Sequence, residues 1–372
     1  MPNRTQPRDI PASRIRVLVI DDSAVIRTAV SHALKDDPEI EVVGSAATGV
    51  IGLRKIEELR PDAVTLDVEM PEMDGLETLR HIRERHPRLI VIMLSTLIEP
   101  GAAITVEALL LGANDYAPKP THCGSVQESL AALRQELVPK IKQFFRTGGP
   151  KSVDVEVASP VKRLDLTHSA AAHERRVVAI GSSTGGPNAL SVILPMFPPA
   201  FHYPILIVQH MPPLFTQLLA ERLQKLVKFR VQEARQGAVV KNGEVFIAPG
   251  GHHLKIKKNG EDLVVQLDNS PPQNSCRPSV DVLFESVEQA YGGSVVAAIL
   301  TGMGQDGLRG TELLKRSGAC VVAQDEPSSV VWGMPGAVAK RGLADMVLPL
   351  QDVVPGILKE FDRCALRARA SK

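Results

Sequence analysis

The sequence predicts an α/β protein of two consecutive domains, each built on a parallel β-sheet, with a β-hairpin inserted in the second. Short apolar runs alternate with amphipathic segments in both halves of the 372-residue chain, which is typical of βα units. Between the halves, residues 147–174 mix glycine, proline, serine and charge without a sustained period, as linkers do. In the second half, Asn259-Gly260 separates two alternating runs, which is the signature of a hairpin.

The first half contains five apolar runs, which are IRVLVI, EVVGSA, DAVTLD, LIVIML and NDYAPK. The segments between them, such as Ser23–Lys35 and Leu76–His86, have Val, Leu and Ile at helical spacing. Five βα units predict a doubly wound parallel sheet. We expect this domain to span residues 14–137 and a linker to span 138–174.

The second half repeats the alternation with the strand-like runs RVVAIG, PILIVQ, EVFIAP, SVVAAIL, ACVVAQ and DMVLPL. The hairpin sequence HLKIKKNGEDLVVQL lies between the third and fourth of these runs. We therefore expect a second doubly wound domain with an inserted hairpin over residues 175–366.

The composition excludes several classes of protein. The chain has 43 basic and 42 acidic residues, a balance that predicts no nucleic-acid-binding or membrane-binding surface. It begins without an apolar signal core and has no run of about 18 apolar residues, so we expect a cytoplasmic protein that is not inserted in a membrane. The cysteines form no CxxC pair, which argues against a zinc site or a disulfide framework; they are Cys123, Cys276, Cys320 and Cys364.

Acidic, hydroxyl and amino groups follow the predicted strands of the first half. Asp21 and Asp22 follow the first strand, Asp67 follows the third, Ser95 the fourth and Lys119 the fifth. Because parallel strands end at one edge of the sheet, we expect these groups to converge. Clustered carboxylates suit Mg²⁺, and a nearby lysine would neutralise a transferred phosphoryl group. The pattern predicts a phosphoryl-accepting pocket in which Asp67 attacks phosphorus.

The stretches IDDS, LDVEMPEMDG, Ser95-Thr96 and DYAPKP resemble the receiver domain of two-component response regulators, over about residues 14–137. The resemblance implies a CheY-like (βα)5 fold that is phosphorylated in a Mg²⁺-dependent reaction. It also implies a cis peptide bond between Lys119 and Pro120. The implied roles are phosphoacceptor for Asp67, metal ligands for Asp21, Asp22 and Asp67, phosphoryl contacts for Ser95 and Lys119, and switch aromatic for Tyr116.

The stretch GSSTGG, residues 181–186, connects an apolar strand to a helix that begins near Pro187. The free N–H groups at a helix start favour negative charge in the turn. Three readings follow from this pattern: a nucleophile whose reaction passes through an oxyanion, a phosphate-binding loop, or a helix cap with tight packing. The pattern G-x-S-x-G, with Ser183 at its centre, favours the nucleophile.

Candidate partners for Ser183 also follow strands. His210 ends PILIVQH and Asp306 follows SVVAAIL, so both are expected at the edge of the sheet that carries Ser183. Asp325, which follows ACVVAQ, is a rival acid. A triad in the elbow-type order Ser, acid, His would have to use His252 or His253, because no histidine comes later in the chain.

Six stretches from about residue 175 to 362 resemble the catalytic domain of CheB-type chemotaxis methylesterases: AIGSSTGGP, IVQHMPP, FIAPGG, RPSVDVLFESV, ILTGMGQDG and VVWGMPGAV. The order of the two domains matches as well. One departure is Cys276, where members of the family often have histidine; we expect it to serve packing. The resemblance implies Ser183 as nucleophile, His210 as base and Asp306 as its orienting acid, with the Met303 N–H and Thr184 near the oxyanion.

The same resemblance implies a phosphorylation-activated hydrolase that removes methyl esters from receptor glutamates and deamidates glutamines, in the adaptation step of bacterial chemotaxis. The implied partners are methyl-accepting chemoreceptors as substrate and a CheA-type histidine kinase as phosphodonor, and the esterase reaction needs no cofactor. A DNA-binding output is disfavoured because the second half alternates strands with helices and lacks a basic recognition helix. A binding protein without activity would show an altered triad, and a lipase-like esterase would have a later histidine.

Overall fold

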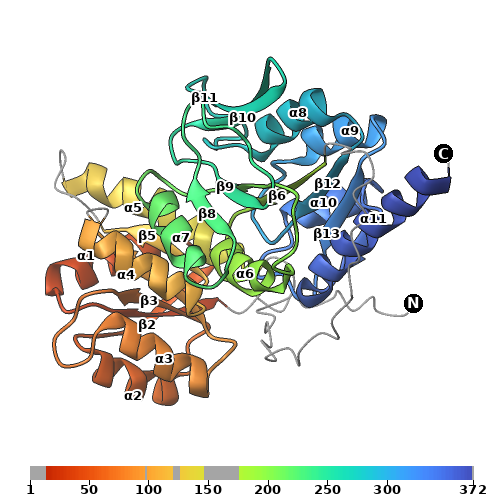
Figure 1. The fold of residues 1–372 in the computed structure, drawn as a ribbon. Coiled ribbons are helices and arrows are strands. Elements are labelled where there is room, and N and C mark those ends of the chain that lie inside the picture. The colour runs from red at the N-terminus through yellow and green to blue at the C-terminus, as the bar shows by residue number, and fades with distance from the viewer. Residues whose placement is uncertain (1–13, 97–98, 120–125, 146–175, 371–372) are drawn as a thin grey trace, which may run out of the picture. The chain divides into compact units, whose positions relative to one another are not determined.

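The computed structural model describes residues 14–96, 99–119, 126–145 and 176–370. These residues form two units, each around its own parallel sheet (Figure 1). The expected α/β fold is therefore confirmed for both halves of the chain. Most of the expected linker and the Lys119–Pro120 peptide bond lie outside the described residues. None of the described helices is long and apolar enough to cross a bilayer.

The first unit has a five-stranded sheet in the order β2-β1-β3-β4-β5. Strands β3 and β4 are buried along their whole length. Both faces of a parallel sheet are covered by helices, which explains their continuous apolar sequences. The strands of this sheet are β1 (Ile15–Ile20), β2 (Ile40–Ala46), β3 (Ala63–Asp67), β4 (Ile90–Ser95) and β5 (Asp115–Pro118), and the helices in this half of the chain are α1 (Ala24–Lys35), α2 (Gly49–Leu59), α3 (Gly75–Arg85), α4 (Glu99–Leu110) and α5 (Val126–Lys142).

Polar side chains begin three of these helices at the carboxyl ends of strands. Ser23, Thr48 and Asp74 each accept a hydrogen bond from a main-chain N–H in the first turn of α1, α2 and α3. Such N-caps satisfy donors that have no partner within the helix. At the other end of this unit, α5 continues past the expected domain end at residue 137, because Leu137 and Ile141 keep its apolar face buried.

The second unit has a seven-stranded sheet in the order β14-β13-β12-β6-β7-β9-β8, and its neighbouring strands are all paired in parallel. Strand β8 was not predicted, because it is short and only one of its residues is buried. The strands of this sheet are β6 (Val177–Ser182), β7 (Ile205–Gln209), β8 (Arg230–Glu233), β9 (Glu244–Ile247), β12 (Val295–Ile299), β13 (Cys320–Gln324) and β14 (Met346–Leu348).

The predicted hairpin is present as a separate antiparallel pair, β10 (His253–Asn259) and β11 (Asp262–Asp268). Asn259 pairs with Asp262, so the turn has two residues, and Gly260 adopts the positive φ of 62° that such a turn requires. The helices of this unit are α6 (Gly186–Ile193), a 3₁₀ turn (Leu194–Met196), α7 (Phe215–Gln224), α8 (Val280–Tyr291), α9 (Leu308–Arg316), α10 (Met334–Lys340) and α11 (Leu350–Ala370).

Helix α8 packs between the hairpin and the sheet. Its Leu283 and Phe284 share one buried core with Leu254 of β10 and Val265 of β11. At its first residue, Val280 lies so close to β6 that a Cβ on Gly181 would come within 2.5 Å of it. This packing brings the start of α8 to the sheet edge where β6, β7 and β12 end (Figure 1).

Candidate functional site

The turn that carries Ser183 is held closely against its neighbours. Gly185 has a positive φ of 76°, and a Cβ there would lie 2.7 Å from Val330. A Cβ on Gly186 would lie 1.9 Å from the amide oxygen of Gln209. The Ser183 N–H donates to the carbonyl of Thr301 at 3.0 Å. The glycines are therefore required by conformation and space, and they leave Ser183 on a rigid turn.

The register of β6 and β7 places Ser183 beside His210. The last paired residues are Ser182 and Gln209, and the His210 N–H donates to the Ser182 carbonyl at 3.1 Å. The buried Gln209 side chain donates to the Ser183 carbonyl at 2.9 Å and to the His210 carbonyl at 3.3 Å. Its oxygen accepts from Ser182 Oγ at 2.7 Å. Gln209 was not predicted as a site residue, although a polar residue at the end of the apolar run PILIVQ was a usable signal.

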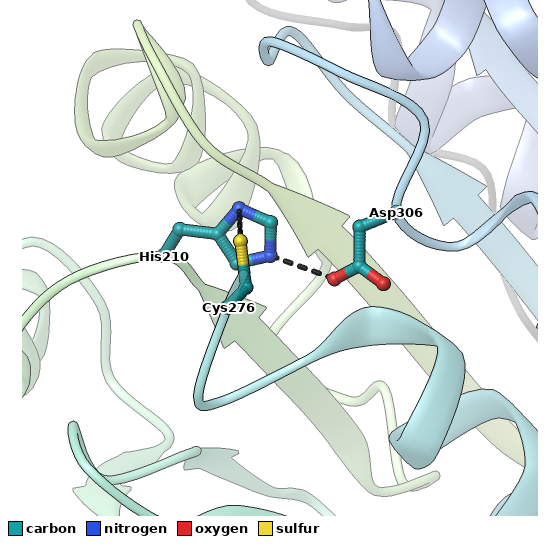
Figure 2. Close-up of side chains that lie close together, drawn as sticks. All are labelled: His210, Cys276 and Asp306. Carbon is teal, nitrogen blue, oxygen red and sulfur yellow. Dashed lines mark hydrogen bonds and ion pairs between the residues drawn. The ribbon is translucent and has the colours of Figure 1, made fainter. Parts of the chain in front are cut away.

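The His210 ring lies between two side chains from distant parts of the chain. Its Nε2 is 2.8 Å from Asp306 Oδ2, and its Nδ1 is 3.5 Å from Cys276 Sγ. Figure 2 shows Asp306 and Cys276 at the two different nitrogens of the ring. These contacts account for the ring's hydrogen bonds, so Ser183 Oγ is not bonded to it in this structure. Cys276 was expected to serve packing, and the structure adds a contact with the histidine.

The start of α8 fixes the Asp306 carboxylate. Oδ2 accepts from the Val280 N–H at 2.7 Å, and Oδ1 accepts from Ser279 Oγ at 2.7 Å and from the Asn274 amide at 2.9 Å. A helix N-terminus favours a negative charge, and charge-assisted hydrogen bonds are the strong ones. Asp306 is therefore held as an anion in one orientation toward His210.

The pKa values of His210 and Asp306 are shifted in opposite directions from their ordinary values. Burial opposes a charge on the His210 ring, but its hydrogen bonds to Asp306 and Cys276 outweigh burial and raise its pKa to about 9. Burial also opposes the charge on Asp306, yet the His210 ring and the donors at the start of α8 lower the pKa of this carboxyl to about 2. Both shifts favour an imidazolium–carboxylate pair, which is the state a proton acceptor reaches during acyl transfer.

The alternative triad residues Asp325, His252 and His253 make hydrogen bonds away from the His210 ring. Asp325 Oδ1 accepts from both the N–H and the hydroxyl of Ser328, so it closes a turn after β13. His253 is buried, where its Nδ1 accepts from the Ser279 N–H and its Nε2 contacts the Pro271 carbonyl. His252 contacts the Gly250 carbonyl. The structure thus brings Asp306 to the His210 ring, and Asp325 to Ser328.

The expected oxyanion residues lie on two loops that approach each other. Thr184 follows Ser183, and its carbonyl accepts from Thr301 Oγ1 at 3.0 Å. A Cβ on Gly302 would lie 2.8 Å from Ser183 Cβ, so the loop after β12 passes directly beside the serine. Met303 follows on that loop and is 43% exposed. Met303 directly follows Gly302, so its backbone lies next to the residue that contacts the turn of Ser183.

The aspartates of the first unit converge as expected. The Lys119 amino group lies 2.6 Å from Asp67 Oδ1 and 3.5 Å from Asp21 Oδ2. One carboxylate oxygen each of Asp21, Asp22 and Asp67 lies within 4.8 Å of the others. Burial raises the pKa of Asp67 to about 6, against the opposing effect of Lys119. The Ser95 carbonyl accepts from the Lys119 N–H at 2.9 Å, so the ends of β4 and β5 are joined here.

This cluster fits a hard divalent cation. Asp67 Oδ2 is buried and has no hydrogen-bond partner among the described residues, and the buried Asp21 Oδ2 has only the Lys119 amino group nearby, at 3.5 Å. Buried carboxylate oxygens without donors are costly unless a cation or proton neutralises them.

Tyr116 lies on β5, where its carbonyl accepts from Lys140 Nζ at 2.7 Å and its ring lies 4.8 Å from the same amino group.

Comparisons with known proteins match both halves of the chain. The family model described as CheB methylesterase matches residues 178–357, and that described as response regulator receiver domain matches residues 17–131. A protein of Nocardioides sp. named "Protein-glutamate methylesterase/protein-glutamine glutaminase" is 49% identical over 354 residues, which cover 94% of this chain and 96% of that protein. A protein of Trichodesmium erythraeum with the same name is 45% identical over 356 residues, which cover 94% of this chain and 99% of that protein. The crystal structure of the Thermotoga maritima CheB methylesterase catalytic domain is 44% identical with a TM-score of 0.49, and the match covers 50% of this chain and 98% of that one.

Proposed function

The chain belongs to the protein-glutamate methylesterase/protein-glutamine glutaminase family, and from this premise we propose that Ser183, His210 and Asp306 carry its hydrolytic chemistry. It is an enzyme that hydrolyses glutamate methyl esters and deamidates glutamines of proteins, with a response regulator receiver domain in the same chain. The observation that supports the residue assignment is the contact of His210 with Asp306. The pairing of β6 with β7 also supports it, because the last paired residues, Ser182 and Gln209, directly precede Ser183 and His210.

In the first step, Ser183 Oγ attacks the carbonyl carbon of the side-chain ester. Because Nε2 of His210 is held by the Asp306 carboxylate, Nδ1 takes the hydroxyl proton, and its contact with Cys276 Sγ gives way to Ser183 Oγ in this step. The Met303 N–H and the turn at Thr184 stabilise the oxyanion, a contribution of about 3–4 kcal/mol for a single donor in comparable sites. The C–O bond then breaks, and methanol leaves with the proton returned from Nδ1.

In the second step, water attacks the glutamyl ester of Ser183. His210 Nδ1 takes a proton from the water, and that proton passes to Ser183 Oγ as glutamate is released. When the substrate is glutamine, ammonia leaves in place of methanol and the second step is unchanged. These steps require only proton transfer and oxyanion stabilisation, so we assign no cofactor to the hydrolytic reaction.

In the receiver domain, we propose Asp67 as the carboxylate that attacks the phosphorus of the phosphodonor. Lys119, which already contacts Asp67, neutralises an oxygen of the transferred group, and the Ser95 hydroxyl contacts another. Tyr116 acts as the aromatic side chain that responds to phosphorylation. Asp21, Asp22 and Asp67 would hold Mg²⁺, which when bound supplies positive charge to the phosphoryl oxygens.

We propose that the natural substrates are methyl-accepting chemoreceptors and that a CheA-type histidine kinase supplies the phosphoryl group. In this setting, phosphorylation of Asp67 activates the esterase, and the reaction resets receptors during chemotactic adaptation in the cytoplasm. The proposed domains are the receiver over 14–137, a linker over 138–174 and the catalytic domain over 175–366, although α5 extends to Lys142.

The experiment that tests the triad measures methanol release from a methylated receptor. Ser183→Ala and His210→Ala should each remove most of the activity, and the double variant should be little worse than either, because triad members act as a unit. Ser191→Ala is the matched control, since its hydroxyl bonds only locally to the Asn188 carbonyl. Strictly additive losses, or activity retained in Ser183→Ala, would contradict the assignment.

A further inference from the structure

We infer that His210 Nδ1 and Cys276 Sγ form a binding site for a thiophilic divalent cation such as Zn²⁺. The two atoms are 3.5 Å apart. Zinc binds imidazole nitrogen at about 2.0 Å and thiolate sulfur at about 2.3 Å, and a tetrahedral angle between these bonds requires a nitrogen–sulfur distance of about 3.5 Å. The observed distance is therefore the one that two ligands of the same tetrahedral ion would have.

The contact of His210 with Asp306 is also one that metal-binding histidines commonly make. Histidines that bind metals usually donate their other ring N–H to a carboxylate, which fixes the tautomer and the orientation of the ring. Asp306 occupies this position, with Oδ2 2.8 Å from Nε2. Because the start of α8 holds Asp306 in turn, the ring is fixed with Nδ1 toward the thiol before any metal arrives.

The loop that carries Cys276 is tied to the same carboxylate. The N–H groups of Gln273 and Cys276 each donate to the carbonyl of the other, at 3.1 and 2.8 Å. Within this turn, the Asn274 amide donates to Asp306 Oδ1 at 2.9 Å. Asp306 thus orients both the histidine and the turn that positions the thiol, so neither ligand has to move far to bind a metal.

The sequence predicts no zinc site, because the cysteines form no CxxC pair. The two ligands are 66 residues apart and meet only through the packing of α8 on the sheet. Two protein ligands leave the remaining positions to water or to substrate oxygen. Such a site is more open than catalytic zinc sites, which have three protein ligands, and than structural sites, which have four.

Metal binding would inhibit the hydrolytic reaction, and this part of the inference depends on the proposed function. When the ion binds, the Cys276 thiol releases its proton to solvent, and His210 releases the Nδ1 proton that its imidazolium form carries, so that the lone pair of Nδ1 is used for coordination. The Nε2–H stays with Asp306. His210 then has no free nitrogen to accept the proton of Ser183, so hydrolysis stops until a chelator removes the ion.

Binding is tested with Co²⁺ on the untagged full-length protein, in the presence of Mg²⁺. We expect a thiolate-to-cobalt charge-transfer band in the near ultraviolet that appears with the wild type and with Cys320→Ala, and that is lost in Cys276→Ala. Cys320 is a matched control because it is a buried cysteine on β13, outside the His210 cluster. A band of equal strength in Cys276→Ala would overturn the site, as would no band in the wild type.

Inhibition is tested by titrating Zn²⁺ into the methanol-release assay. The concentration for half inhibition should rise at least tenfold in Cys276→Ala relative to the wild type and Cys320→Ala, whatever the activity without zinc, and EDTA should restore each protein. Equal sensitivity of the three proteins would overturn the inhibitory role. The cobalt band reports the site without any activity, so failure of the proposed triad would not be mistaken for failure of the metal site.

Discussion

The side-chain amide of Gln209 donates a hydrogen bond to the main-chain carbonyl of Ser183 at 2.9 Å, across the last pair of β6 and β7. The residue before the proposed base thus holds the turn of the proposed nucleophile. The same amide reaches the carbonyl of His210, and its oxygen accepts from the Ser182 hydroxyl. Gln209 is therefore a positioning residue that joins the two loops of the triad.

Gln209→Ala should lower both stability and turnover. The substitution leaves the buried Ser182 hydroxyl without its acceptor, which costs about 1–3 kcal/mol for an unsatisfied buried group. It also removes one donor each from the His210 carbonyl and from the Ser183 carbonyl, which keeps the Gly186 N–H. We expect kcat to fall at least tenfold with a smaller change in KM, because the reacting groups lose their alignment. Urea unfolding and methanol release measure the two effects, with the exposed Gln217→Ala as control. Unchanged kcat in a destabilised protein would show that Gln209 is only structural.

The role of the acid can be separated from that of its rival. Asp306→Asn removes the charge that orients and stabilises the His210 imidazolium, so methanol release should fall by more than about tenfold, although less than in Ser183→Ala. Asp325→Asn should stay within about twofold of the wild type, because Asp325 bonds Ser328 and not His210. If Asp325→Asn is the damaging change and Asp306→Asn is silent, the acid assignment is wrong.

Strand ends explain how much of this site could be predicted. Ser183, His210 and Asp306 come shortly after β6, β7 and β12, and parallel strands end at one edge of a sheet, so their convergence follows from the sequence pattern. The same rule placed Asp21 and Asp67 near Lys119 in the first unit. Buried strands with continuous apolar runs were also predictable, because both of their faces are covered.

The remaining features depend on tertiary packing. Cys276 and Asn274 lie between the hairpin and α8, and only the packing of that helix on the sheet brings them to His210 and Asp306. No local pattern encodes such a position. Strand β8 was missed because its four residues have too few buried positions to show a period. The domain end at residue 137 stays a prediction, although α5 continues to Lys142 with Ile141 buried.

The pH dependence of hydrolysis should reflect the raised pKa of His210. The base must be neutral to accept a proton, and a pKa of about 9 keeps it charged at lower pH. We therefore expect kcat/KM, measured with EDTA present, to rise with pH and to level off above about pH 9. Cys276→Ala removes one of the hydrogen bonds that raise this pKa, so its profile should shift to lower pH. A wild-type profile that levels off near pH 6, or one that Cys276→Ala leaves in place, would contradict the role of these contacts.

Phosphorylation should depend on one carboxylate. Asp67 is the buried side chain that contacts Lys119 at 2.6 Å, while Asp22 is exposed, so Asp67→Ala should abolish the acid-labile acyl phosphate formed from a small phosphodonor. EDTA should abolish labelling of the wild type as well, because the buried Asp67 Oδ2 has no hydrogen-bond donor and the buried Asp21 Oδ2 has only the Lys119 amino group, at 3.5 Å, to offset its charge. Asp62→Ala is a matched control, since that carboxylate accepts from the Arg16 N–H away from the cluster.

In full-length protein, phosphodonor should raise methanol release by the wild type and by Asp62→Ala, and leave methanol release by Asp67→Ala unchanged. Labelling that survives in Asp67→Ala, or activation of that variant by phosphodonor, would show that another residue receives the phosphoryl group.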